Sequence, residues 1–277
     1  MLRRLGVDPA PGKGLVVFDP AAPEGGHFQR VDPRGARNWL ATERSSGPLL
    51  VGWDAPLVAA FDQTYTERPI ERLLKDQLGP AVSVRGFSGC PHWTISLDVL
   101  GRPLPASVHL ANDDRLPLRF PGDHAEGEGV VETHPAVALA LLWPEDDDLP
   151  IYKARADVSA AVARANVKRI EDYLKLCADA VFGVAWVDLP KNPTRSRAVP
   201  VERDVFAGGV GLDDLLDAQV SYLCIEAMVA QKAVCLGDPS SGYFAVPRTR
   251  KAEALQARFD QAVAEEVRRN PDHAGGR

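Results

Sequence analysis

One long segment near the C-terminus, Leu212 to Val234, constrains the fold of this 277-residue chain more than any other stretch. Its apolar residues recur at three- and four-residue spacing, which predicts a helix. Such a helix has a broad apolar stripe that must be buried against another layer of the protein. The residues that carry the spacing are Leu216, Val220, Leu223, Ala227 and Ala230.

Acidic residues open this predicted helix, and one of them lies on its packed side. Asp217 shares a helix face with Val220 and Cys224, because residues three and four apart are neighbours on a helix. A carboxylate there is costly unless a cation or hydrogen-bond donors meet it, which favours a cation near Asp217. Asp213 and Asp214 keep a second interpretation, in which Asp213 caps the helix and its neighbours complement the helix dipole.

Three short apolar stretches end on an acid, and each is typical of a β-strand. Leu5-Gly6-Val7-Asp8 is followed by turn residues and a second strand, Leu15 to Phe18, which together predict a hairpin. Leu49 to Asp54 is an uninterrupted apolar run, as expected of a central strand covered on both faces. Gly129 to Glu132 is followed by His134 and by a proline that suits the first turn of a helix. Ligands of open α/β sheets gather beyond strand ends, so these acids are candidate functional residues.

The remaining segments complete an α/β pattern. Residues 61–124 alternate helical runs with Gly/Pro-rich pieces, which we interpret as an excursion from the main sheet. The chain is therefore predicted to be one domain over residues 1–277, with an insertion at about 61–124. The other predicted elements are a strand at 27–31, helices at 34–44, 136–142, 157–184 and 251–269, and an edge-like strand at 243–247.

Composition narrows the classes of function. Acidic residues outnumber basic ones, 38 to 32, so a nucleic-acid partner would need a local basic patch. The four cysteines form no C-x-x-C pair, which makes buried free thiols in a reducing cytosol the default. The N-terminus leaves no room for a signal peptide, and no stretch is long enough to span a membrane. We therefore expect a soluble cytoplasmic protein.

The segment from Asp188 to Ala207 is rich in proline and basic residues and leads directly to the acidic helix. It is either a solvated loop or the source of the missing positive patch for a phosphate backbone. A histidine at a helix start likewise either bonds to backbone or has a functional role. The predicted substrate-binding residues are Lys13, His134, Lys191, Arg195 and Arg197.

The acids could form a metal-binding site if the fold brings them together. Clustered carboxylates raise one another's pKa and are hard to keep ionised unless divalent cations lie among them. Mg²⁺ and Mn²⁺ prefer oxygen ligands and retain waters that a substrate phosphate can replace. Two such ions about 3.5–4 Å apart can activate a water and stabilise the leaving oxygen of a phosphodiester. The acids concerned are Asp8, Asp54, Glu132, Asp214 and Asp217.

At these positions the chain resembles a known family. The hairpin after a strand-end Asp, the mid-chain strand-end Asp and the D-x-x-D-A motif are similar to the RNase H-like superfamily, which includes Holliday-junction resolvases. Within it, the motifs and their order most resemble the predicted bacterial nucleases of domain-of-unknown-function family 429. These motifs are Gly6-Val7-Asp8, Trp53-Asp54-Ala55-Pro56-Leu57, Glu132-Thr133-His134-Pro135, Asp214 to Ala218, and Gly237-Asp238 with Gly242 and Pro247.

The resemblance implies a mixed five-stranded sheet with one antiparallel strand, flanked by helices and followed by a C-terminal helix. It also implies that Asp8 bridges the metals, Asp54 is a ligand from the neighbouring strand and Asp217 closes the site from the helix. Asp214 would be an alternate or outer metal ligand. Glu132, in the family's E-x-H-P motif, would reach the site as a further catalytic residue.

The implied activity is metal-dependent phosphodiester hydrolysis on DNA or RNA, with Mg²⁺ or Mn²⁺ as cofactor and two ions in the site. The alternative is a non-catalytic protein that keeps the fold and uses the cleft for a nucleotide or a partner. An ATP-binding fold of the actin and sugar-kinase type ranks last, because the chain lacks paired Gly-rich phosphate loops.

Overall fold

A mixed five-stranded sheet forms the centre of the computed structural model, with the strand order β3-β2-β1-β4-β7. Strand β2 runs antiparallel to both of its neighbours, and β4 is parallel to β1 and β7. The strands are β1 (Arg3–Ala10), β2 (Gly14–Phe18), β3 (Phe28–Val31), β4 (Leu49–Trp53) and β7 (Gly129–Glu132). The predicted α/β fold with one antiparallel strand is therefore confirmed.

The structure describes most of the chain, including all five strands of this sheet. The described residues are 1–59, 67–78, 82, 92–101, 104–105, 115–122, 127–144, 147–191, 205–239 and 241–269.

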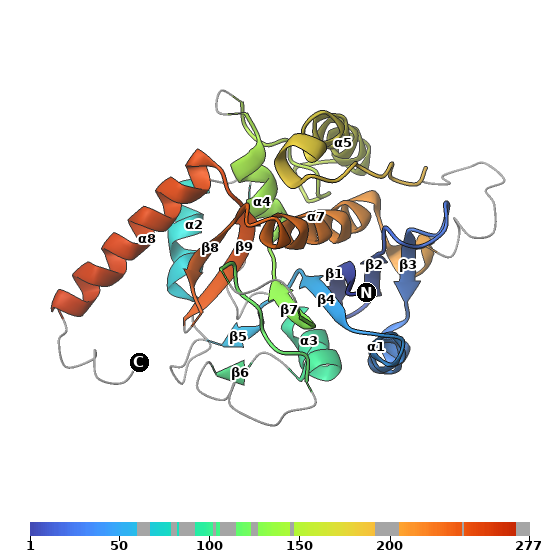
Figure 1. Ribbon diagram of the computed structural model, residues 1–277. Helices are drawn as coiled ribbons and strands as arrows, with labels where there is room; N and C mark the ends of the chain where they lie inside the picture. Colours follow the sequence, from blue (N-terminus) through green and yellow to red (C-terminus); the bar gives the residue numbers. More distant parts are fainter. Residues whose placement is uncertain are drawn as a thin grey trace.

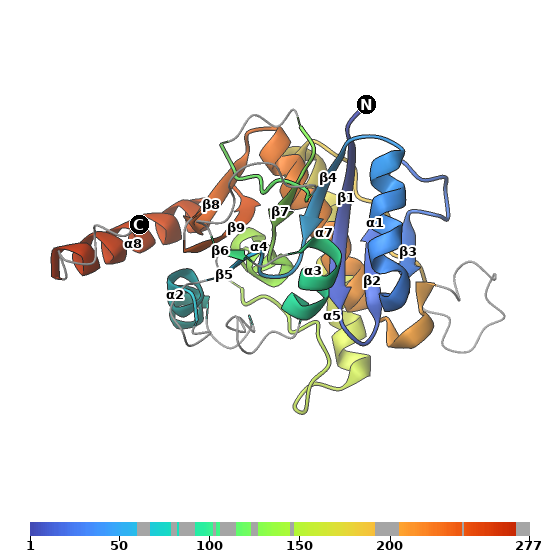
Figure 2. The same ribbon diagram turned by 90° about the horizontal axis from the view of Figure 1, so that it is seen from below.

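Helices cover both faces of the sheet, α1 and α3 on one side and α7 on the other (Figures 1 and 2). Helices α4 and α5 pack against the outer side of α7 and form a further layer (Figure 1). The helices are α1 (Ala36–Ser45), α2 (Pro69–Leu78), α3 (His92–Leu100), α4 (Pro135–Leu142), α5 (Ala160–Phe182), α7 (Leu212–Val229) and α8 (Arg250–Arg269), with short 3-10 turns η1 (Pro33–Gly35) and η5 (Ala207–Gly209).

Two small sheets lie beside the main one. The described part of the predicted insertion contains α2, α3 and β6 (Leu104–Pro105), and β6 pairs in parallel with β5 (Val58–Ala59), which lies just before the insertion. A hairpin of β8 (Ala233–Asp238) and β9 (Gly242–Pro247) joins the β7 edge through a single bridge between Thr133 and Ala245.

Alternation along β1 and β4 decides which side chains each face carries, because successive side chains of a strand point to opposite faces. Leu5 and Val7 belong to the core under α1 and α3, together with Val51 and Trp53. Gly6, Gly52 and Asp8 alternate with these residues and therefore face α7. Asp54, which follows Trp53, also lies on this face.

The long helix differs from its predicted bounds at its C-terminal end. Helix α7 starts at Leu212 as expected, but it ends at Val229 rather than at Val234. Gln231 adopts a positive φ of 58°, and Val234 pairs with Val246 in the β8–β9 hairpin. The apolar spacing continued past the helix because β8 is also buried on the core, so spacing alone did not mark the boundary.

The other predicted elements are present with small shifts at their ends. Helix α4 begins with Pro135 at its first position, and α5 is capped by Ser159, whose hydroxyl accepts a hydrogen bond from the Val162 amide. Helix α8 follows the hairpin and extends away from the body of the protein (Figure 2). Within the described residues, no helix has both the length and the apolar composition that crossing a bilayer requires.

Candidate active site

Two paired glycines allow α7 to lie directly on the sheet. Gly6 and Gly52 are register partners in β1 and β4. A Cβ atom on Gly6 would lie 1.9 Å from the carbonyl oxygen of Ala218, and one on Gly52 would lie 2.3 Å from that of Ser221. Both distances are far below a normal contact, so the helix backbone occupies the space that a side chain would need. The first turns of α7 are thereby held at the ends of β1 and β4.

Asp8 projects from the end of β1 into this contact zone, two residues beyond Gly6. It is buried, with only 4% of its surface exposed. Burial raises the pKa of Asp8 well above its usual range, and the neighbouring carboxylates of Asp214, Asp54 and Asp217 raise it further. Acids from two strands and one helix are thus close enough to interact electrostatically, although Asp8 and Asp217 are not among the residues that line the cavity described below.

Asp54 lies beside Asp8 at the end of the neighbouring strand. Its amide donates a hydrogen bond to the Val7 carbonyl oxygen (3.0 Å), which fixes the carboxyl group at this strand end. Burial, followed by repulsion from Asp217, raises the pKa of Asp54 to about 8. Asp213, in the first turn of α7, has a pKa raised to about 6, again chiefly by burial and then by Asp214. The site thus holds several buried carboxyl groups that are hard to deprotonate at the same time.

Asp217 is the most enclosed acid of the cluster, with 1% of its surface exposed. Its Oδ1 accepts a hydrogen bond from the Tyr152 hydroxyl (2.8 Å), and its Oδ2 lies 2.6 Å from Nζ of Lys153. Burial raises the pKa of Asp217, although both of these contacts act in the opposite direction. The cation that the sequence predicts near Asp217 is thus, in this structure, a lysine ammonium.

Asp214 meets a second lysine from the β1–β2 turn. Nζ of Lys13 lies 2.7 Å and 3.0 Å from the two carboxylate oxygens of Asp214. Asp214 also accepts a hydrogen bond from the Gly211 amide (2.6 Å), so Gly211 rather than Asp213 is the N-cap of α7. Arg30 donates to the Lys13 carbonyl oxygen (2.7 Å) and holds the turn in place.

Glu132 points to the other side of the sheet from Asp8, although its charge contributes to the raised pKa of Asp54. It pairs with Trp53 in register, and Trp53 faces the α1 and α3 side of the sheet, opposite to Asp8. Oε1 of Glu132 lies 2.6 Å from a guanidinium nitrogen of Arg68, and Oε2 accepts a hydrogen bond from the Leu57 amide (2.7 Å). Arg68 is itself bound by Glu71. This geometry favours a supporting role for Glu132, and its predicted catalytic role stays a prediction.

A cavity of about 340 Å³ opens beside the acids. Its walls carry both signs of charge, with Asp54, Asp213 and Asp214 among the acids and Lys13, Lys153 and Arg155 among the cations. Such a mixture suits a ligand complex that contains both a cation and an anion, as a metal-bound phosphate does.

His134 also lines this cavity and is held neutral. Burial, followed by the charges of Lys153 and Arg68, lowers the pKa of His134 to about 3. Its ring packs edge-on against Phe244 with centroids 5.1 Å apart, and it makes no side-chain capping bond to α4. Nδ1 is shielded from water and has no hydrogen-bond partner within the described part of the chain.

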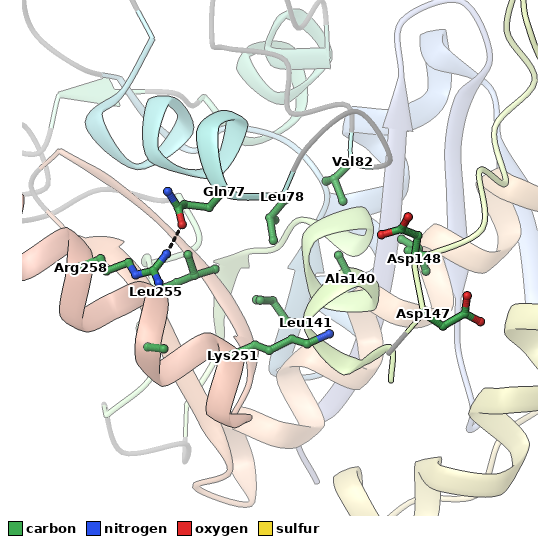
Figure 3. A pocket seen from close by; sticks show the side chains of 12 residues that line it. Gln77, Leu78, Val82, Ala140, Leu141, Asp147, Asp148, Lys251, Leu255 and Arg258 are labelled. Carbon is green, nitrogen blue, oxygen red and sulfur yellow. Dashed lines mark hydrogen bonds between the residues drawn. The ribbon is translucent and has the colours of Figure 1, made fainter. Parts of the chain in front are cut away.

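A second cavity of about 330 Å³ lies between α2, α4 and α8 (Figure 3). Arg258 and Gln77 form a hydrogen bond between α8 and α2, and Lys251 lies along another wall (Figure 3). Asp147 and Asp148 are the acids drawn there, and Asp147 is paired with Arg169 outside the cavity. None of the clustered acids lines this cavity, so the first cavity is the candidate site.

The predicted basic loop is only partly described. Lys191 is exposed at the end of a described segment, whereas Arg195 and Arg197 lie outside the described residues. Their predicted contribution to substrate binding stays a prediction.

The residues that the sequence did not reveal are mainly partners of the acids. Tyr152 and Lys153 belong to a short aromatic and basic run, Ile151 to Arg155, between two helices. The run itself could have indicated a functional segment, but nothing in its spacing indicates which acid its side chains contact. Arg68 was similarly hidden in the insertion, and it is fully buried between Glu71 and Glu132.

The acids are chemically suitable ligands for a divalent cation, but their side chains are not arranged to bind one in this structure. Within the described ranges, no three His, Cys, Asp or Glu side chains lie close enough together to hold a metal ion. Carboxylate oxygens are nevertheless the ligands that Mg²⁺ and Mn²⁺ prefer. Among the described residues, the buried Oδ2 of Asp217 has no hydrogen-bond partner and is paired with the Lys153 ammonium. This atom is the clearest ligand position of the cluster.

Comparisons of the chain with protein-family models, with curated proteins and with solved structures find no match.

Proposed function

We propose that this protein is a divalent-metal-dependent phosphodiesterase that acts on nucleic acid, related to the RNase H-like nucleases of family 429. The single observation that carries the proposal is the meeting of Asp8, Asp54 and Asp217 from two strands and a helix, with pKa values raised by burial and mutual repulsion. A cluster that resists ionisation gains most from a divalent cation. The strand order with one antiparallel strand agrees with the fold that the resemblance implies.

In this proposal Asp8, Asp54 and Asp217 hold Mg²⁺ or Mn²⁺, with Asp214 as an outer ligand. The bound ions would supply an activated water and stabilise the leaving oxygen of the phosphodiester. The chain's own basic residues give the site its affinity for an anion, since Lys13 and Arg155 line the same cavity.

Glu132 supports this site rather than joining it. Its bond to the Leu57 amide and its ion pair with Arg68 fix the segment that follows Asp54. We infer that the buried pair keeps the cavity wall in shape.

Metal binding and hydrolysis are tested separately on the wild type and two variants. Mn²⁺ should raise the melting temperature of the wild type, because a ligand bound only by the native state stabilises it. Single-stranded, double-stranded and junction forms of DNA and RNA are then assayed with Mg²⁺ or Mn²⁺. Asp8→Asn should abolish hydrolysis while melting at or above the wild-type temperature without metal, since it relieves repulsion. Asp98→Asn, at an exposed acid of α3, is the control.

Two results would contradict the proposal. An Asp8→Asn variant that unfolds in metal-free buffer would make Asp8 a structural residue. Hydrolysis that persists at the wild-type rate in this variant would place the catalytic site elsewhere.

A second candidate function is favoured by the two lysines. Because Lys13 and Lys153 already neutralise part of the cluster, the same fold can serve as a non-catalytic module that binds a nucleotide or a partner in the cavity. Nucleotide binding that requires neither Mn²⁺ nor Mg²⁺, without hydrolysis of any substrate, would favour this candidate.

A further inference from the structure

The acidic cluster contains its own counter-ion. Lys153 comes from the segment between α4 and α5, and its ammonium lies 2.6 Å from Oδ2 of Asp217. The side chain is 48% exposed, whereas that of Asp217 is 1% exposed. The lysine therefore reaches from the surface into the buried end of the cluster, with its stem outside.

The charge of Lys153 acts on the whole cluster and not on Asp217 alone. Desolvation acts to lower its pKa, but attraction to Asp217, Asp54 and Asp8 prevails and raises the pKa well above the usual lysine value. Conversely, Lys153 is the cation that counteracts the raised pKa of both Asp8 and Asp54. Its positive charge thus acts on the same carboxylates that a bound cation would stabilise.

Lys153 and a metal would need the same atom. Oδ1 of Asp217 is engaged by the Tyr152 hydroxyl, so Oδ2 is the oxygen left for a ligand role. Apart from Lys153, no hydrogen-bond partner reaches this buried oxygen from the described residues. To bind a cation at 2.0–2.1 Å, as Mg²⁺ demands, Oδ2 must release the ammonium.

We propose that Lys153 is an internal counter-ion that exchanges with the divalent cation at Asp217, and so sets the metal affinity of the site. The proposal rests on the metal-binding function above. In the metal-free protein Lys153 stabilises the buried carboxylate. In the metal-bound protein its ammonium leaves Oδ2 and remains at the cavity that its own segment lines, where an anionic oxygen of the substrate can bind.

The exchange predicts opposite effects of one substitution on stability and on metal affinity. Lys153→Met should lower the melting temperature without metal, because Asp217 loses the ammonium group that is paired with it. The same change should tighten Mn²⁺ binding by at least about tenfold, since a competing charge about 4 Å from the ion interacts by more than 1.4 kcal/mol at protein-like dielectric values. Mn²⁺ affinity is read from the metal dependence of the melting temperature, with no substrate present.

The matched control is Lys168→Met. Lys168 is an exposed lysine of α5 that pairs with Glu171 and Asp172, away from the cluster. It removes the same unit of charge, so it reports any general effect of net charge on Mn²⁺ binding. Lys153→Arg keeps the positive charge, so its Mn²⁺ affinity should stay as weak as that of the wild type. Lys153→Gln provides a second neutral variant if the methionine variant does not fold.

The outcomes separate this inference from the proposed function. Tighter Mn²⁺ binding in the neutral Lys153 variants than in Lys168→Met supports the exchange. Equal or weaker binding, with a wild type that does bind Mn²⁺, overturns the exchange and leaves the metal site standing. Absence of any Mn²⁺ effect in the wild type and in all variants overturns both.

Discussion

Replacement of Gly6 by alanine tests how closely α7 must approach the sheet. The new Cβ would lie 1.9 Å from the carbonyl oxygen of Ala218, whereas a close carbon–oxygen contact is about 3.3 Å. The helix must therefore move by about 1.4 Å, or the strand must yield by the same amount. Over-packing of this kind costs about 1–3 kcal/mol. At about 2–4 °C per kcal/mol for a chain near this size, the melting temperature should fall by several degrees.

The same movement should impair metal binding more than it impairs folding. Asp217 is the residue next to Ala218, so any displacement of the helix carries its carboxylate away from Asp8 and Asp54. Binding constellations tolerate displacements of only about 0.5 Å. Gly6→Ala should therefore lose the Mn²⁺-dependent rise in melting temperature while it remains folded.

Two further glycines make the test quantitative. Gly52→Ala meets the Ser221 carbonyl oxygen at 2.3 Å and should show a smaller effect of the same kind. Gly35→Ala has no atom within 4 Å of the new Cβ and should melt close to the wild type. The reasoning is refuted if Gly6→Ala melts like Gly35→Ala and retains its full response to Mn²⁺.

Two other predictions concern charge. The metal-free protein should lose stability as the pH rises from about 4 to about 8, because folding raises the pKa of Asp213 from 3.8 to about 6 and that of Asp54 from 3.8 to about 8. Between these values the folded state holds protons that the unfolded state has released. Thermal melts across this range should show the decline, it should shrink in Asp54→Asn, and a flat profile would contradict the shifts. Arg68→Met removes the buried guanidinium that pairs with Glu71 and Glu132, and it should cost about 3–5 kcal/mol by chemical denaturation. Arg37→Met breaks an exposed pair and should cost less than about 1 kcal/mol; equal effects would refute this reasoning about the buried ion pairs.

The sequence determined the layered α/β architecture because hydrophobic periodicity is a local property. The apolar run from Leu49 to Trp53 can be satisfied only between two covered faces, and the hairpin after Asp8 follows from local turn chemistry. The position of Asp217 on the packed side of its helix was equally readable. The end of that helix was not, because helix and buried strand both continue the apolar pattern into Val234.

Only the tertiary structure decided which charges meet. Lys153 and Asp217 are 64 positions apart, and Lys13 and Asp214 are 201 positions apart, so no local pattern pairs them. Glu132 ends a strand like the other acids, yet the register between β4 and β7 turns it to the opposite face and toward Arg68. A sequence indicates that a strand ends on an acid, but the side to which the acid points depends on register and on the partner elements. Those are long-range properties, which depend on strand pairing such as that of Trp53 with Glu132.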